Sequence, residues 1–182
     1  MTDVVTGFHG TRLNHVESIL RGGFILSKND YDWLGDGVYF FQDGFQLAKH
    51  WSEKFYGDNG VVIGATIELD DCMDLVDSRW ADFLKNAHRE LFAKLEADDM
   101  LPPRQSTGAH RLDRAVINYA AASLEKRGHN VRAVRAPFHE GYPLYPNSAL
   151  FTKSHIQIAV RDISLIKKVW LEVGNLRRLT DD

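Results

Sequence analysis

Two short stretches decide how this sequence is interpreted: Phe8-His9-Gly10-Thr11 and Gly35-Asp36-Gly37-Val38-Tyr39-Phe40. The first ends the β-rich segment 4–8, which predicts a strand running into a turn. The second places glycines before an apolar run, which predicts a buried strand that presents a tyrosine. Because glycine has no Cβ, a ligand can approach the backbone closely at Gly10. Either stretch alone is explained by a hydrogen-bonded histidine or a core tyrosine, but the two together indicate a binding site.

Two short helices are predicted next to these stretches. Asn14 and Asp43 are each followed three positions later by Glu or Gln, which is the pattern of a capping box. Apolar residues recur at helical spacing behind each cap, and glycines end both patterns. We therefore expect helices over residues 14–22 and 43–57, with a loop of turn-forming residues, 29–37, between the two strands and helices.

The rest of the chain predicts helices and strands without a strict βαβ order. Apolar spacing predicts helices over 77–98 and 112–124, whereas β-type composition predicts strands over 61–69, 130–136, 155–160 and 168–173. The proline-containing segment 137–153 is expected to be an irregular loop. This arrangement favours a mixed α+β fold over a doubly wound one.

Composition places the chain among globular proteins with one core. It has 182 residues, 20.7 kDa and 44% apolar residues. A single cysteine, Cys72, excludes an internal disulfide and a zinc site built on paired cysteines, and no neighbouring basic group predicts a nucleophilic thiol. No apolar run reaches the ~20 residues that cross a bilayer, and the start lacks a signal peptide. These features predict a cytoplasmic protein with no membrane partner.

Several classes of site find no motif in the sequence. There is no Rossmann fingerprint, P-loop, nucleophile elbow or His-Glu-x-x-His, and the histidines lack the clustering of a metal site. No metal is therefore expected.

Charge is divided unevenly along the chain. Residues 68–99 contain ten acidic and four basic side chains, whereas residues 104–135 contain seven basic and two acidic ones. A basic segment suits a nucleic acid or a dinucleotide phosphate, but it is more typical of a solvated helix surface. The hypothesis of a nucleic-acid-binding domain that uses segment 104–135 therefore stays open.

The order of these elements resembles one family. A His-Gly-Thr strand end, a helix closed by Gly-Gly-Phe, a loop, Gly-x-Gly-Val-Tyr-Phe and an aromatic helix resemble the NAD-dependent ADP-ribosyltransferases. The similarity is strongest to the branch of the poly(ADP-ribose) polymerases and diphtheria toxin. It covers residues 7–57, extends to 154–162, and has no counterpart for 70–145. It implies a single domain, 1–182, with a split, mostly antiparallel β-sheet, flanking helices and a helical insertion around 77–128.

The resemblance implies roles for the first two stretches. His9 would bind a ribose hydroxyl of NAD, Gly10 would offer its backbone to the nicotinamide carboxamide, and Tyr39 would stack on the nicotinamide ring. Thr11 would either cap the following segment or touch the adenine side, and Phe40 is expected at the NAD site as well. NAD would be a substrate, lying extended in the cleft between the two halves of the sheet, and no metal is implied.

Several family positions are altered here. The second stacking aromatic corresponds to His50, next to Trp51, and a small serine of the family corresponds to Leu47. The acidic residue of a late strand corresponds to Gln157, which removes a charge that would stabilise an oxocarbenium-like transition state.

Two residues near Gln157 are candidates for further roles: one would replace the missing negative charge, and the other would select the acceptor. Glu140, expected in the loop before the strand, would bring a carboxylate over the site, and His155 would lie at an acceptor-selecting position on the face of Gln157. Exposed polar residues without function are the ordinary explanation for both. Trp33 and Asp36 lie in the loop that folds over NAD in this family, although Trp33 would also suit a surface aromatic.

The leading hypothesis is an ADP-ribosyltransferase that releases nicotinamide and modifies a protein or nucleic-acid acceptor. Its setting would be a bacterial toxin or antiphage-defence effector, with a possible cognate antitoxin. One alternative is a module that binds NAD or ADP-ribose without turnover, and the other is the nucleic-acid-binding domain.

Overall fold

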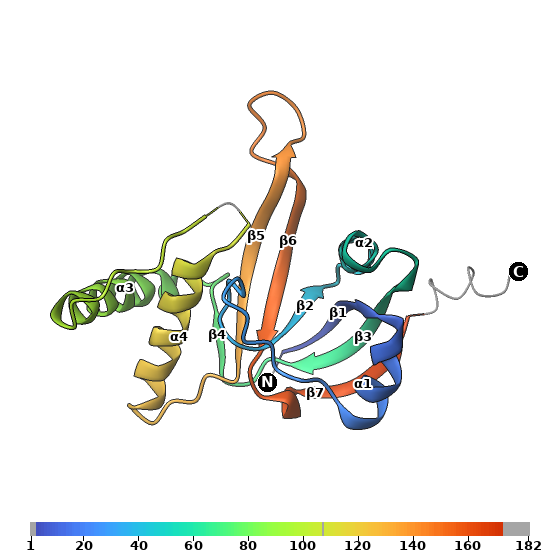
Figure 1. Ribbon diagram of the computed structural model, residues 1–182, viewed down its shortest axis with the longest axis horizontal. Coiled ribbons are helices and arrows are strands. Elements are labelled where there is room, and N and C mark those ends of the chain that lie inside the picture. Colours follow the sequence, from blue (N-terminus) through green and yellow to red (C-terminus); the bar gives the residue numbers. More distant parts are fainter. Residues whose placement is uncertain (1–2, 107, 173–182) are drawn as a thin grey trace, which may run out of the picture.

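A computed structural model describes residues 3–106 and 108–172 and has α+β architecture (Figure 1). The strands of its sheet are β1 (Val4–Arg12), β2 (Val38–Gln42), β3 (Gly60–Glu68), β4 (Cys72–Asp74), β5 (Ala133–Pro143), β6 (Phe151–Val160) and β7 (Ile166–Leu171). The helices are α1 (Val16–Gly22), α2 (Phe45–Tyr56), α3 (Arg79–Ala97) and α4 (Arg111–Glu125). Short 3-10 turns cover Leu13–His15, Gly57–Asn59 and Ile163–Leu165. The predicted class, a mostly antiparallel sheet with flanking helices, is confirmed.

The seven strands form one sheet in the order β4-β5-β6-β2-β1-β3-β7. All neighbouring pairs are antiparallel except β4 and β5. The ladder between β1 and β2 has only two residue pairs, Gly7 with Gln42 and Phe8 with Phe41. Beyond Phe8 the two strands part, although β1 stays paired with β3 along its whole length. The sheet is therefore narrowly joined at its centre.

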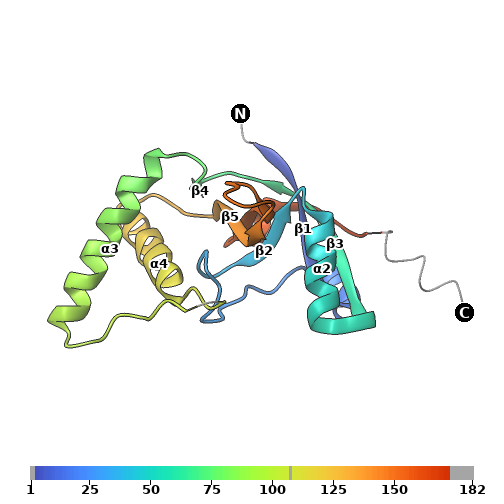
Figure 2. The same ribbon diagram turned by 90° about the horizontal axis from the view of Figure 1, so that it is seen from above.

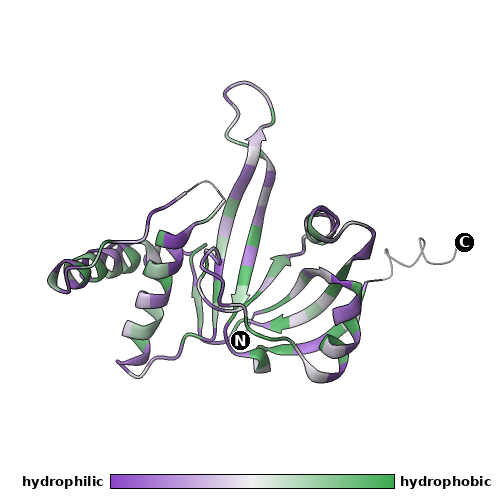
Figure 3. Ribbon diagram, in the orientation of Figure 1, coloured by the Kyte–Doolittle hydropathy of each residue, from purple (hydrophilic) through white to green (hydrophobic). Residues whose placement is uncertain are grey.

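The two faces of the sheet are covered differently. On one face Phe40, Ile63 and Ile158 pack with Val16 of α1. On the other face α4 packs over β5 and α2 packs over β1 and β3, with β2 between them (Figure 2). Apolar residues concentrate in the central strands (Figure 3). Helix α3 packs mainly on α4 and stands away from the sheet.

Both capping predictions are wrong although both helices exist. The N-cap residue of α1 is His15 and that of α2 is Gly44, and neither residue makes a side-chain hydrogen bond that caps its helix. Asp43 instead adopts a left-handed conformation, with φ of 51°, and its backbone N–H donates to the Thr6 carbonyl oxygen at 2.9 Å. The tight turn after β2 is thus fixed by β1 rather than by a capping box.

The loop predicted over 137–153 is also wrong, because most of it forms the hairpin of β5 and β6 that projects from the sheet (Figure 1). Pro137 lies in β5 opposite Ile156. Its missing N–H faces the β4 side, where pairing has already ended at Arg135. A proline is tolerated there because no ladder hydrogen bond is lost.

The helical predictions for the middle of the chain hold, since α3 and α4 lie between β4 and β5. The short strand β4 has no expected counterpart, and its parallel pairing with β5 depends on a partner 61 positions away. The last strand ends at Leu171, and the predicted strand end at Val173 lies outside the described residues. No helix in the described ranges has the length and apolar character needed to span a membrane.

Candidate functional site

A cavity of about 340 Å³ lies where β2, α2, the β5–β6 hairpin and the loop 29–37 meet. Four predicted site residues line it from four different elements: Tyr39 of β2, His50 of α2, Glu140 of β5 and Gln157 of β6. Phe40, Leu47 and Trp51, which the sequence also placed at the site, line it as well. The volume falls in the range of small-molecule sites, about 300–1,000 Å³.

The Tyr39 ring is held in place through its hydroxyl. The hydroxyl donates to the Gly35 carbonyl oxygen and accepts from the Leu34 N–H, both at 2.8 Å. Burial raises the pKa of this phenol far above its ordinary value of 10, so it stays neutral. The ring forms a fixed wall, and its hydroxyl serves the loop 29–37 rather than proton transfer.

His9 is joined to Tyr39 but does not line the cavity. Its Nδ1 donates to the Tyr39 carbonyl oxygen at 2.8 Å, across the gap where β1 and β2 part. Its ring contacts Phe24 and Phe40 edge-on and at a tilt, on the face opposite the Tyr39 ring. Burial lowers the pKa of His9, so the imidazole is neutral with Nε2 as an acceptor. The two predicted rings are thus linked through the backbone and do not face each other.

Gly10 is required first by helix packing. A Cβ at this position would lie 2.7 Å from the Ala48 carbonyl oxygen, so α2 can approach β1 only because residue 10 is a glycine. Hydrogen bonds alternate along β1, and the Thr6 carbonyl oxygen points to the β2 side. The N–H and C=O of Gly10 therefore also point to that side, beyond the last β1–β2 pair. Thr11 is buried and lies outside the cavity lining.

Both ends of the Gln157 amide are engaged. The Trp33 indole N–H donates to Oε1 at 2.8 Å, and Nε2 donates to His155 Nε2 at 2.8 Å. His155 donates from Nδ1 to the Lys153 carbonyl oxygen at 2.8 Å, which fixes its neutral tautomer. Burial lowers the pKa of His155 and supports this neutral form. The structure therefore brings His155 and Gln157 together, as their spacing on one strand face predicts.

Glu140 lines the cavity from a strand, not from the predicted loop. It lies on β5 opposite Lys153 of β6. Its placement on the cavity side follows from the alternation of β5, which puts Phe138 and Glu140 on one face. The carboxylate and the Gln157 amide thus belong to one cavity.

The loop 29–37 is fastened to α4 by contacts that the sequence does not reveal. Arg114 donates to Asp36 Oδ1 at 2.6 Å, and Asn118 Nδ2 donates to the same oxygen at 3.2 Å. Asn118 Oδ1 accepts from the Asp36 N–H and would contact a Cβ at Gly35, whose φ is 81°. These partners are about eighty positions apart, so no local pattern identifies them. Asp36 is therefore an anchor of the loop.

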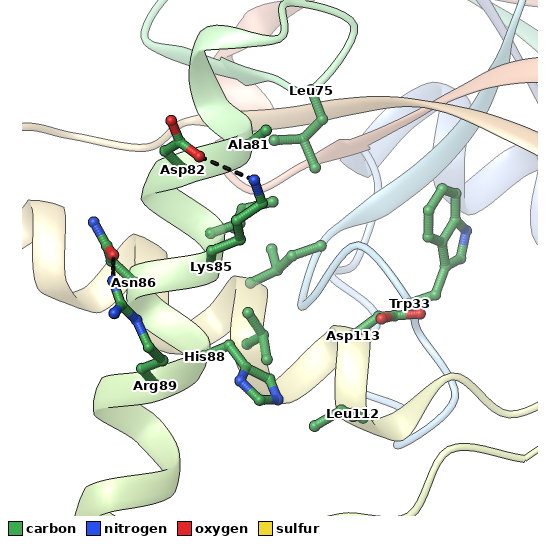
Figure 4. Close-up of a pocket in the computed structure, with 13 residues that line it drawn as sticks. Trp33, Leu75, Ala81, Asp82, Lys85, Asn86, His88, Arg89, Leu112 and Asp113 are labelled. Atoms are coloured by element: carbon green, nitrogen blue, oxygen red, sulfur yellow. Dashed lines mark hydrogen bonds and ion pairs between the residues drawn. The ribbon is translucent and has the colours of Figure 1, made fainter.

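A second, larger cavity of about 1,110 Å³ lies between α3 and α4 (Figure 4). Trp33 belongs to the lining of both cavities. Charged side chains around the larger one have partners close in the sequence: Lys85 pairs with Asp82 at 3.0 Å, and Asp113 lies 3.3 Å from His110 Nδ1. Of the predicted site residues only Trp33 reaches it. The smaller cavity is therefore the candidate functional site.

Metal and thiol chemistry find little support in the described part of the chain. It holds no group of three His, Cys, Asp or Glu side chains that could bind a metal ion. Burial raises the pKa of the Cys72 thiol to about 12, so the thiolate nucleophile is scarce at neutral pH.

Comparison with known proteins adds one relative. No protein-family model matches the chain. The chain is similar to the uncharacterized protein MJ0359 of Methanocaldococcus jannaschii, with 29% identity over 93% of this chain and 88% of that protein. The similarity spans nearly the whole length of both chains.

Proposed function

We propose that the protein is an NAD-dependent ADP-ribosyltransferase. The observation that carries the proposal is that Tyr39, His50 and Gln157, which the resemblance implies are site residues, line one cavity of about 340 Å³. A flat ring bound there would lie against Tyr39, whose position the loop fixes at two hydrogen bonds. Preorganised contacts of this kind favour catalysis because no reorganisation is needed during the reaction.

The gap between β1 and β2 suits a primary carboxamide. The N–H and C=O of Gly10 point to the β2 side beyond the last β1–β2 pair, next to the cavity-lining Tyr39 although Gly10 itself is outside the cavity lining, and a carboxamide can both donate to and accept from one peptide unit. The proposal therefore places the nicotinamide amide at Gly10 and the nicotinamide ring on Tyr39. His9 spans the two strands by its bond to the Tyr39 carbonyl oxygen, so its role in the proposal is to hold the backbone of β2 in place, not to contact the ribose.

The reaction breaks the bond between the ribose anomeric carbon and the nicotinamide nitrogen, and the acceptor nucleophile forms a new bond to that carbon. Nicotinamide leaves neutral, the acceptor loses a proton, and positive charge develops on the ribose. Gln157 orients the ribose but cannot neutralise this charge. Glu140 lines the same cavity and supplies the negative charge.

The basic segment 104–135 supports an enzyme better than a nucleic-acid-binding surface. Four of its arginines form ion pairs with aspartates of the same chain: Arg111, Arg114, Arg132 and Arg135. The side chains of Arg114, Arg132 and Arg135 are only 17–25% exposed in these pairs and are therefore less available to phosphates, whereas Arg111 is 47% exposed. The acceptor, protein or nucleic acid, and a role as a cytoplasmic toxin or defence effector remain part of the proposal.

A module that binds NAD or ADP-ribose without turnover is the second candidate. It is favoured by the neutral Gln157, whose amide is already bound at both ends. Such a module would need the same Tyr39 wall but no charge at position 157.

The test follows nicotinamide release from NAD and incorporation of ADP-ribose into lysate components. We expect turnover in the wild-type protein, its loss in Tyr39→Ala and His9→Ala, and its retention in Tyr142→Ala, an exposed tyrosine outside the cavity. Thermal stabilisation by NAD without nicotinamide release would favour the binding module. The absence of both thermal stabilisation by NAD and nicotinamide release would reject the NAD site.

A further inference from the structure

Trp33 occupies the side of Gln157 that faces the cavity. Its indole N–H donates to Gln157 Oε1 at 2.8 Å, and its ring packs on Phe138 with centroids 4.1 Å apart. His155 holds the other end of the amide, so the amide cannot rotate without losing both bonds. The amide oxygen is therefore directed at the Trp33 indole.

We propose that Trp33 closes the cavity by binding the Gln157 amide, and that a ligand hydroxyl must displace the indole N–H to reach this oxygen. The inference rests on the proposed function, because the hydroxyl is that of the nicotinamide ribose. It makes Trp33 a residue that opposes ligand binding, not one that contributes to it.

The backbone around Trp33 is fixed on both sides. Asp32 accepts from Ser27 Oγ at 2.5 Å and from the Asn29 N–H at 2.8 Å, while Leu34 and Gly35 are held by the Tyr39 hydroxyl. Asp36 is tied to Arg114. Displacement therefore requires rotation of the Trp33 side chain, and the loop backbone keeps its place.

The larger cavity can accommodate the Trp33 indole after it leaves Gln157. Trp33 stands at the margin of the groove between α3 and α4, on the side away from α3 (Figure 4). The groove has a volume of about 1,110 Å³ and an apolar interior that includes Leu84, Leu112 and Val116. An indole that leaves Gln157 can stay in apolar surroundings there, which lowers the cost of opening.

The test compares NAD affinity, by calorimetric titration, in the wild type, Trp33→Phe and the control Trp80→Phe. Phenylalanine keeps a ring against Phe138 but has no N–H for Gln157. Trp80 lies on α3, outside the lining of both cavities. We expect Trp33→Phe to bind NAD about three- to ten-fold more tightly, the equivalent of one hydrogen bond, with no change in Trp80→Phe. Equal or weaker binding by Trp33→Phe would overturn the proposal.

A second measurement separates this inference from the proposed function. The Trp33 indole N–H is followed by NMR hydrogen exchange without any NAD. We expect slow exchange in the wild type and fast exchange in Gln157→Leu, which keeps the side-chain volume and removes the acceptor. Slow exchange in Gln157→Leu would overturn the contact itself. Absence of NAD binding in every variant, with the exchange result as expected, would instead reject the NAD site while the Trp33–Gln157 contact stands.

Discussion

The two cavities differ in the kinds of side chain that line them. The larger, between α3 and α4, is lined by apolar side chains and by charged groups that pair with residues close in the sequence. The smaller collects polar side chains from β2, α2, β5 and β6, and hydrogen bonds hold two of them, Tyr39 and Gln157, in place. By volume alone the larger cavity would be the candidate functional site. The smaller cavity is the better candidate because catalysis requires polar groups that are held close together in fixed positions.

The largest difference should come from removing one wall of each cavity. Tyr39→Ala removes the ring of the smaller cavity and the hydroxyl that holds the loop, so we expect nicotinamide release to fall at least about 100-fold. Leu112→Ala removes a comparable apolar side chain from the larger cavity and should leave the rate within about two-fold. Circular dichroism and thermal unfolding of both variants check that the folded protein is compared. Equal losses of rate would erase the distinction between the cavities.

Helix α2 can line the smaller cavity because Gly10 lets it approach β1 closely, and a substitution at Gly10 tests this packing separately. In Gly10→Ala the new Cβ would meet the Ala48 carbonyl oxygen at 2.7 Å, so α2 must shift. We expect the free energy of unfolding to fall by about 1–3 kcal/mol, as for other overpacked sites. Gly22→Ala is the matched control, because nothing lies within 4 Å of a Cβ there and the residue is helical. Urea unfolding of the two variants measures the difference, and similar stabilities would refute the packing role.

The charge missing at position 157 can be restored. Gln157→Glu places a carboxylate beside the anomeric carbon, and we expect nicotinamide release to rise about ten-fold, equivalent to about 1.4 kcal/mol of transition-state stabilisation. The same carboxylate faces His155 Nε2, so the pKa of His155 should rise above its wild-type value. Kinetics and an NMR titration of His155 measure both effects. An unchanged or lower rate in a folded variant would mean that another residue, not Gln157, holds the position of the family's acidic residue.

The smallest expected effect concerns pH. His9 and His155 have a pKa lowered mainly by burial, below the ordinary 6.5. The unfolded chain therefore takes up protons at higher pH than the folded chain does, so stability present above pH 6.5 is lost as the pH falls below it. Unfolding free energies measured from pH 7.5 to 5 should decrease, with a shallower slope in His155→Gln. An unchanged slope in that variant would mean that His155 is not held neutral.

Prediction from sequence succeeded where signals are local. The strand that carries Tyr39 follows from a short apolar run after two glycines, and α2 follows from its aromatic spacing. A strand was also predicted over 4–8, but β1 continues to Arg12, so His9, Gly10 and Thr11 lie in the strand and not in the predicted turn. The spacing of His155 and Gln157 also places both on one strand face without knowledge of the fold.

Prediction failed where partners are distant. The prolines of segment 137–153 predict a loop, yet the segment forms most of a hairpin. Whether a proline costs a ladder hydrogen bond depends on which strand edge its nitrogen faces, and only the assembled sheet shows this. The roles of Arg114 and Asn118 depend on a loop about eighty positions away. His9 was expected beside the nicotinamide riboside, yet strand alternation places its ring on the face opposite Tyr39, where it bridges β1 and β2. Register, which decides such placements, is set by pairing and not by composition.

The most direct measurement is a crystal structure of the protein soaked with NAD or nicotinamide. The account predicts a pyridine ring against Tyr39, its carboxamide at the Gly10 backbone, and the Trp33 indole moved off Gln157 toward α4. A ring bound in the groove between α3 and α4, with the Tyr39 wall bare and Trp33 still on Gln157, would contradict it.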